Sequence, residues 1–269
     1  MPFPLLIILL TVATYAQTSL HDERDGKTYK TVKIGTQTWM AENLNYNALG
    51  SKCYGEDGEI VMGFDEEKRE HVYVQLSDNE IKANCVKYGR LYNFATAMGL
   101  PYNCNASVCT SQNVKYQGIC PEGWHIPSNA EWDKLVQYAD DASSMQGILP
   151  YESYSAGSHL KATNGWSDDE GKPANGTDKY GFAALPGGYY NNETGRFNLI
   201  NRQGFWWTTE EYNEKYMEIL CATVYDHCGY DEPVDGNDYA YYRRIYSDGK
   251  ILWSHQEKNT MLSVRCVKD

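Results

Sequence analysis

The chain lacks any block of lysine and arginine residues. Its 36 acidic side chains outnumber the 24 basic ones, which gives a net charge of −12. Nucleic acids and anionic membranes attract proteins through clustered positive charge. We therefore expect neither as a partner. The acidity would keep an exported protein soluble, or would supply oxygen ligands to a cation.

Long hydrophobic runs are missing after the N-terminus. The one apolar run lies in residues 1–16, which read MPFPLLIILLTVATYA and end in small residues. This pattern predicts a secretory signal peptide cleaved after Ala16, although no lysine or arginine precedes the run. The run is also too short to span a bilayer comfortably. We expect a mature chain without a membrane span, secreted or held at the cell surface.

No Cys-x-x-Cys motif occurs, and the cysteines are not clustered with histidine, which disfavours a zinc site. All eight cysteines follow the signal segment. An even number of cysteines in an exported chain predicts four disulfides. By spacing, Cys104 with Cys109 and Cys221 with Cys228 would each close a short loop.

Phenylalanine is scarce, with 6 residues against 23 tyrosines and 7 tryptophans. The aromatic rings therefore mostly bear a polar group, which suits half-exposed surfaces and interfaces. The alternative is that tyrosine simply fills β-strands, where it is favoured.

The apolar pattern predicts two early helices and a strand-rich second half, which is an α+β class. One helix is expected within residues 90–98, ended by Gly99, and one at about residues 129–140, begun by Ser128 with Glu131 three residues on. Residues 142–181 read mostly as loop. Strands are expected at residues 30–34, 37–40, 72–76, 204–209, 219–225, 239–246, 250–254 and 262–267. No repeat or linker divides the chain, so a polar leader (17–27) precedes a single domain (28–269).

Seven segments together resemble the Fibrobacter succinogenes major paralogous domain family. They read DGKTYKTVKIG (25–35), TWMAENLN (38–45), YGRLY (88–92), CPEGWHIPSNAEWDKL (120–135), YGFAALPGG (180–188), GFWWTTE (204–210) and SVRCVKD (263–269). The resemblance implies a C-type-lectin-like fold, distantly similar to the formylglycine-generating-enzyme branch. It also implies a bridge from Cys120 to Cys266, which leaves Cys53 and Cys85 to close an acidic insertion. It leaves the function open.

Catalysis is the less favoured reading of the sequence. The formylglycine-generating relatives need a reactive cysteine pair that binds copper, and a thiol in a disulfide can do neither task. His125 lies in a turn with no partner nucleophile or acid evident from spacing, so we expect a structural role. No carboxylate pair for glycoside hydrolysis can be located among the many acids.

Calcium is a possible cofactor, since acidic side chains gather in two loops. One loop holds Asp168, Asp169 and Glu170, with Asn175 and Asp178 nearby. The other contains the predicted ligands Asp226, Asp231, Asp235 and Asp238, with His227 as a further metal candidate. Neither matches an EF-hand, and Glu232-Pro233-Val234 departs from the lectin Glu-Pro-Asn motif. A solvated acidic loop is the simpler alternative.

Long loops on a disulfide-bonded scaffold favour a binding module that recognises an extracellular glycan or protein. The binding face is expected at about residues 142–200 and 226–238. A glycan would stack on exposed rings, for which the candidates are Trp166, Tyr189, Tyr190, Tyr151 and Tyr154. Each ring could instead fill space beneath the loops. The alternative functions are a secreted polysaccharide hydrolase and a self-associating structural surface protein.

Overall fold

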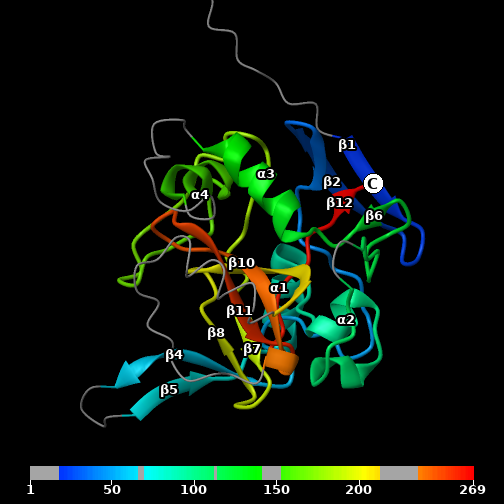
Figure 1. Ribbon diagram of the computed structural model, residues 1–269. Helices are drawn as coiled ribbons and strands as arrows, with labels where there is room; N and C mark the ends of the chain where they lie inside the picture. The colour runs from blue at the N-terminus through cyan, green and yellow to red at the C-terminus, as the bar shows by residue number, and fades with distance from the viewer. Residues whose placement is uncertain (1–17, 66–69, 112–113, 141–152, 213–235) are drawn as a thin grey trace, which may run out of the picture.

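The computed structural model describes residues 18–65, 70–111, 114–140, 153–212 and 236–269 (Figure 1). The predicted signal segment, the predicted strand at 219–225, Cys221 and Cys228 lie outside these ranges. The described chain mixes helices with three sheets, so the mixed helix and sheet content expected from the sequence is confirmed. None of the described helices has the length and apolar character needed to cross a membrane.

The first sheet joins the two ends of the described chain. Its order is β1-β2-β3-β12-β6, with all pairs antiparallel. The strands predicted at residues 30–34 and 37–40 are present as β2 and β3, which pair antiparallel on either side of Gly35. The predicted strand at residues 262–267 is limited to Val267 and Lys268, preceded by isolated bridges. The bounds are Thr18–Asp22 (β1), Lys27–Ile34 (β2), Gln37–Met40 (β3), Trp124–His125 (β6) and Val267–Lys268 (β12).

Two further sheets build the other half of the molecule. One has the order β11-β10-β9 and the other β5-β4-β8-β7, in which only β4 and β8 are parallel. Figure 1 shows the β4–β5 ribbon projecting from the body. The bounds are Glu59–Asp65 (β4), Glu70–Val74 (β5), Tyr189–Asn191 (β7), Arg196–Asn198 (β8), Gly204–Glu211 (β9), Tyr239–Ile245 (β10) and Ile251–Glu257 (β11).

The two predicted helices are present. Helix α3 (Asn129–Ala139) begins with the expected capping box of Ser128 and Glu131. Helix α2 (Phe94–Met98) begins later than predicted, because the Asn93 side chain accepts a hydrogen bond from the Thr96 amide and so caps it. Gly99 ends α2 in the left-handed conformation, at φ 67°.

Two more helices, α1 (Asp78–Tyr88) and α4 (Tyr154–Leu160), were not predicted. Only Tyr88 is buried in α1, so this helix has no apolar periodicity to detect. Its capping box of Ser77 and Glu80 was a usable signal. Helix α4 is short and contains Gly157. Two 3₁₀ turns, η1 (Tyr102–Asn105) and η2 (Gly236–Asp238), complete the described helical elements.

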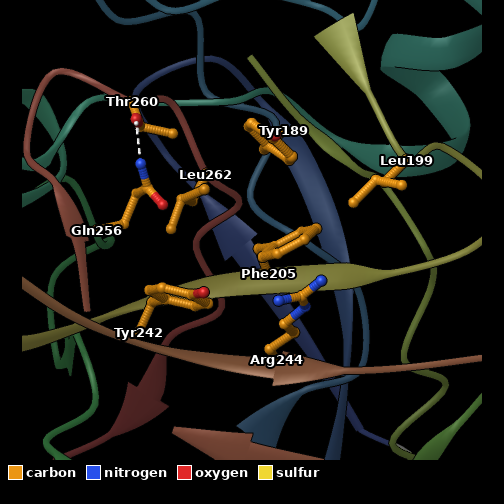
Figure 2. Close-up of a pocket in the computed structure, with 8 residues that line it drawn as sticks. All are labelled: Tyr189, Leu199, Phe205, Tyr242, Arg244, Gln256, Thr260 and Leu262. Atoms are coloured by element: carbon orange, nitrogen blue, oxygen red, sulfur yellow. Dashed lines mark hydrogen bonds between the residues drawn. The ribbon is translucent and has the colours of Figure 1, made fainter. Parts of the chain in front are cut away.

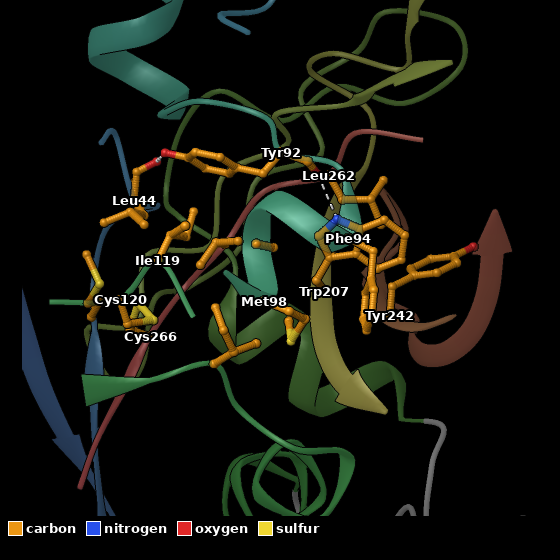
Figure 3. Close-up of a cluster of buried hydrophobic side chains, with 14 of the residues drawn as sticks. Leu44, Tyr92, Phe94, Met98, Ile119, Cys120, Trp207, Tyr242, Leu262 and Cys266 are labelled. Atoms are coloured by element: carbon orange, nitrogen blue, oxygen red, sulfur yellow. Dashed lines mark hydrogen bonds between the residues drawn. A yellow bond between two sulfur atoms is a disulfide. The ribbon is translucent and has the colours of Figure 1, made fainter. Parts of the chain in front are cut away.

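Three buried clusters form the core. The first packs α2 against β9, β10 and the chain terminus, and Figure 3 shows Phe94 and Trp207 beside Leu262. The second packs α3 and α4 with Trp39, Trp132 and Trp206. The third lies under β4, β7 and β8.

The described residues contain three disulfides: Cys53–Cys85, Cys104–Cys109 and Cys120–Cys266. Each is a pair expected from the sequence, with Cα separations of 5.0, 5.6 and 6.0 Å. The expected total of four is not borne out, since the structure describes three. The Cys120–Cys266 bridge is embedded in the first core cluster (Figure 3).

Candidate ligand-binding pocket

The structure does not place Trp166 and Tyr190 in an exposed aromatic platform. The Trp166 side chain is 2% exposed, and its Nε1 donates to the Ala184 carbonyl at 2.9 Å. Tyr190 is 6% exposed and packs on Phe197, with 4.7 Å between ring centroids. Trp166 and Tyr190 belong to different core clusters, so they neither share a patch nor offer a ring face to a sugar.

The other predicted site residues are scattered. Tyr154 is 58% exposed at the start of α4, and Tyr189 is half-buried against Phe205. Tyr151 and three predicted calcium ligands (Asp226, Asp231, Asp235) lie outside the described residues. Asp238 lies in η2, and the described part of the chain contains no group of three side chains that could hold a metal ion. Calcium binding stays a prediction.

His125 is a structural link between the C-terminus and α3. Its Nδ1 lies 2.7 Å from Asp269 Oδ1 and its Nε2 lies 2.9 Å from Glu131 Oε1. The ring is 2% exposed. Burial favours a raised pKa for Glu131, but hydrogen bonds from His125 and Ser128 outweigh it and lower the pKa to about 2. Both ring nitrogens of His125 are therefore engaged in holding the fold.

A pocket that the sequence did not reveal lies between the β9–β10–β11 sheet and β7 (Figure 2). It has a cavity volume of about 90 Å³. Its base consists of buried side chains, and its rim of half-exposed ones. The lining residues are Tyr189, Leu199, Phe205, Tyr242, Arg244, Gln256, Thr260 and Leu262.

Arg244 gives the pocket its positive charge. Its guanidinium carbon lies 5.1 Å from the Phe205 ring centroid and 4.1 Å from that of Tyr246, and its Nε donates to Gln203 Oε1 at 2.6 Å. Among the residues that the structure describes, no carboxylate pairs with Arg244. The guanidinium is thus held in place by rings and an amide while its charge stays unbalanced.

The other polar groups of the pocket are neutral. Burial raises the pKa of Tyr189 and of Tyr242, so both hydroxyls stay protonated and can donate. Gln256 Nε2 donates to Thr260 Oγ1 at 3.1 Å, which fixes the Gln256 carboxamide at the rim (Figure 2). A rigid cation surrounded by hydroxyl donors suits a ligand with an anionic oxygen group.

The lining contains no aspartate, glutamate or histidine. Glycoside hydrolysis by a carboxylate pair needs such groups beside the substrate. The pocket can therefore bind, but it lacks the side chains for this chemistry.

The sequence could not reveal this site, because its residues come from four separate strands and from three positions outside the strands. The usable signal was the alternation of Tyr242 and Arg244 along β10, which places both side chains on one face. The register that sets Arg244 opposite Phe205 depends on strand pairing across the fold.

Comparison with known proteins identifies the family. No curated protein and no solved structure matches the chain. The family model of the Fibrobacter succinogenes major domain matches residues 32–268, which is most of the chain. The match covers six of the seven segments almost completely and overlaps the seventh, and it includes the whole pocket. The chain therefore belongs to the Fibrobacter succinogenes major domain family.

Proposed function

We propose that the protein is a secreted or cell-surface binding module that captures an extracellular glycan or protein through a carboxylate or similar anionic group. The observation behind this proposal is the Arg244 guanidinium, which is fixed by stacking on Phe205 and Tyr246 and lacks a carboxylate partner within the described residues. A charged donor that is already oriented loses little entropy when a ligand binds.

The size of the pocket limits what enters it. A cavity of roughly 150 Å³ accommodates a benzene molecule, and this one measures about 90 Å³. We propose that one functional group of the ligand enters, while the rest of the ligand stays outside. A carboxylate fits this description, either on an acidic sugar or on a peptide.

A C-type-lectin-like scaffold and export are parts of the same proposal. The bridge between Cys120 and Cys266, which joins the segment before α3 to the terminal strand, is compatible with such a scaffold. Disulfides persist in oxidising compartments, which favours export. Mass spectrometry of exported protein should find Gln17 as the first residue, and an intact Met1 would contradict cleavage after Ala16.

The test compares ligands that differ only in charge. Glucuronic acid is titrated against glucose, and a short peptide with a free C-terminal carboxylate against its amide, by isothermal calorimetry. The carboxylate member of each pair should bind more tightly than its neutral partner, and Arg244→Met should weaken the carboxylate members at least tenfold. Arg202→Met is the matched control, because Arg202 is a surface arginine paired with Asp169 at 3.4 Å. Equal binding of charged and neutral ligands, or undiminished binding by Arg244→Met, would overturn the proposal.

A further inference from the structure

A second hollow lies on the opposite side of the segment 259–262. Asn259 and Met261 line it, whereas Thr260 and Leu262 line the Arg244 pocket. Met261 and Leu262 lie in β-bridges, where successive side chains point to opposite sides, so this segment divides the two spaces. The second hollow, which we call the Asn259 groove, has a volume of about 400 Å³. A space of this size admits a sugar ring or two.

Carboxamides line the groove. Asn93 Oδ1 accepts from the Thr96 amide at 2.8 Å, and Asn259 Oδ1 lies 3.4 Å from the Tyr102 hydroxyl. Within the described chain, neither Nδ2 group has a hydrogen-bond partner, and the exposed Asn192 side chain has none either. A carboxamide both donates and accepts, as a sugar hydroxyl does.

Exposed apolar side chains stand beside these amides. Tyr102 is 66% exposed and Leu49 is 99% exposed. Exposed aromatic rings mark interaction sites when polar groups surround them. A tyrosine ring can stack on the apolar face of a sugar while the neighbouring amides bind its hydroxyls.

The groove is close to neutral. No carboxylate lines it, and its one cation is already engaged. Lys52 Nζ lies 3.3 Å from the Glu56 carbonyl and 3.4 Å from an Asp57 carboxylate oxygen, and it also lies over the Tyr190 ring. The groove therefore has no strong preference for a charged ligand.

An extended peptide fits the groove less well. Peptides that add to a sheet need an open strand edge. Here the backbones along the groove are paired in bridges, Lys52 with Leu91, Tyr92 with Leu262 and Tyr190 with Met261. The groove offers side-chain amides in place of free backbone groups.

We infer that the Asn259 groove binds a neutral saccharide. The inference rests on the proposed function for its extracellular setting, but the groove shares no residue with the Arg244 pocket. The two sites therefore differ in the charge of the ligand they would bind, and each proposal can be contradicted without the other.

The experiment titrates full-length mature protein with neutral hexasaccharides of glucose, mannose, galactose and xylose, by calorimetry and by NMR of the side-chain amides. At least one sugar should bind and shift the Asn93 and Asn259 signals. Tyr102→Ala and Asn259→Ala should each weaken binding at least tenfold. Tyr138→Ala is the matched control, because Tyr138 is also an exposed tyrosine (47%) but lies on α3.

Arg244→Met should leave neutral sugar binding unchanged, which separates this inference from the proposed function. The inference is overturned if no neutral sugar binds at millimolar concentration. It is also overturned if Tyr102→Ala binds as tightly as the unaltered protein, or if an uncharged extended peptide shifts the same amide signals and the sugars do not.

Discussion

At the residue scale, the Asn43 carboxamide joins four segments that are far apart in sequence. Its Nδ2 donates to the Tyr88 carbonyl at 2.9 Å and lies 3.3 Å from Ser263 Oγ. Its Oδ1 accepts from Trp206 Nε1 at 2.8 Å and from Arg265 Nη2 at 3.0 Å. Arg265 is fully buried, and its guanidinium carbon lies 4.3 Å from the Phe182 ring centroid. Together with Phe182, these residues come from five of the seven segments that resemble the family, so the family pattern includes a buried hydrogen-bond network.

We predict that Asn43→Leu lowers the free energy of unfolding by about 3 kcal/mol, because it deprives a buried guanidinium of an acceptor. Urea denaturation measures the change. Asn47→Leu, at an exposed position four residues further along the chain, should change stability by less than about 0.5 kcal/mol. Equal effects of the two substitutions would show that the network contributes little.

Glu131 makes the stability of the folded protein depend on pH. Its pKa is about 2 in the folded protein, below the ordinary value of 4.5. A lowered folded pKa stabilises the native state above the unfolded pKa, and this contribution is lost as the pH falls from about 4.5 to 2. The shift in pKa corresponds to a stabilisation of the native state by about 3 kcal/mol at most. Partial exposure of the Glu131 side chain reduces this contribution.

We predict that Glu131→Gln is less stable than the unaltered protein at pH 7, and that the difference shrinks below pH 4. Denaturation midpoints between pH 2 and 7 test this. Glu122→Gln, at an exposed position, serves as the control. A difference that stays constant with pH would contradict an electrostatic role for Glu131.

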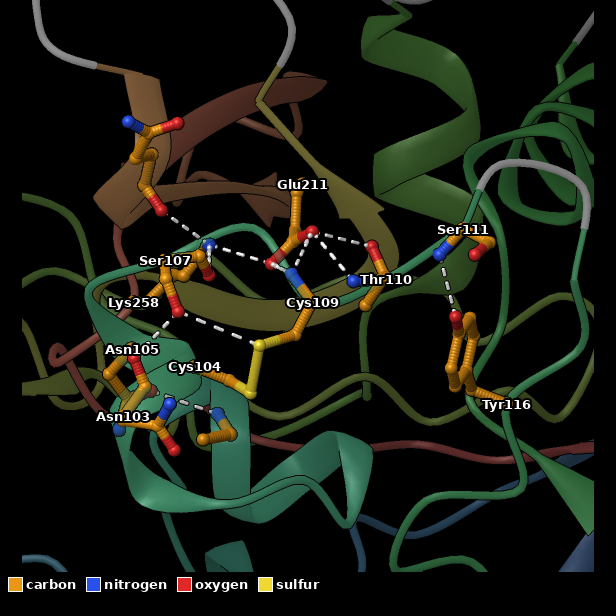
Figure 4. The surroundings of a disulfide bond; sticks show 12 residues. Asn103, Cys104, Asn105, Ser107, Cys109, Thr110, Ser111, Tyr116, Glu211 and Lys258 are labelled. Carbon is orange, nitrogen blue, oxygen red and sulfur yellow. Dashed lines mark hydrogen bonds and ion pairs between the residues drawn. A yellow bond between two sulfur atoms is a disulfide. The ribbon is translucent and has the colours of Figure 1, made fainter.

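At the scale of elements, one buried ion pair fastens the loop after η1 to the β9–β11 sheet (Figure 4). Lys258 Nζ donates to Glu211 Oε1 at 2.7 Å and to the carbonyls of Ser107 and Asn237. Glu211 also accepts from the backbone amides of Cys109 and Thr110. The pair therefore positions the loop that contains the Cys104–Cys109 bridge.

We predict that Lys258→Met lowers the free energy of unfolding by about 3–5 kcal/mol, because it leaves the Glu211 charge buried without its cation. Adding Glu211→Gln should recover part of the loss, since a neutral amide can still accept from the loop. Chemical denaturation of the single and double variants measures both effects, and hydrogen exchange should show faster opening of residues 104–111. A double variant no more stable than Lys258→Met would contradict the argument from charge.

At the scale of the whole molecule, local signals predicted local structure well. Helix α3 follows from Ser128, Glu131 and the spacing of Trp132 and Leu135, all within a few residues of one another. The Arg244 pocket depends on side chains from four strands, from the connection between β8 and β9, and from the segment after β11, so no window of sequence contains it. Burial of Trp166 also depends on distant packing.

The long disulfide is predicted to stabilise the molecule more than the short one. Cys120–Cys266 closes a loop with a sequence separation of 146, against 5 for Cys104–Cys109. In the chain-entropy model the long bridge stabilises the fold by about 5 kcal/mol and the short bridge by about 2 kcal/mol. Replacing each pair with alanine should therefore lower the melting temperature unequally, by about 10 °C or more for the long bridge. Calorimetry of the two double variants measures the difference. The ranking reflects the unfolded chain. The long bridge keeps the middle of the domain close to its C-terminal strand once the sheets have separated, whereas the short bridge constrains only a local loop. Equal losses would instead mean that each bridge acts through its native contacts alone.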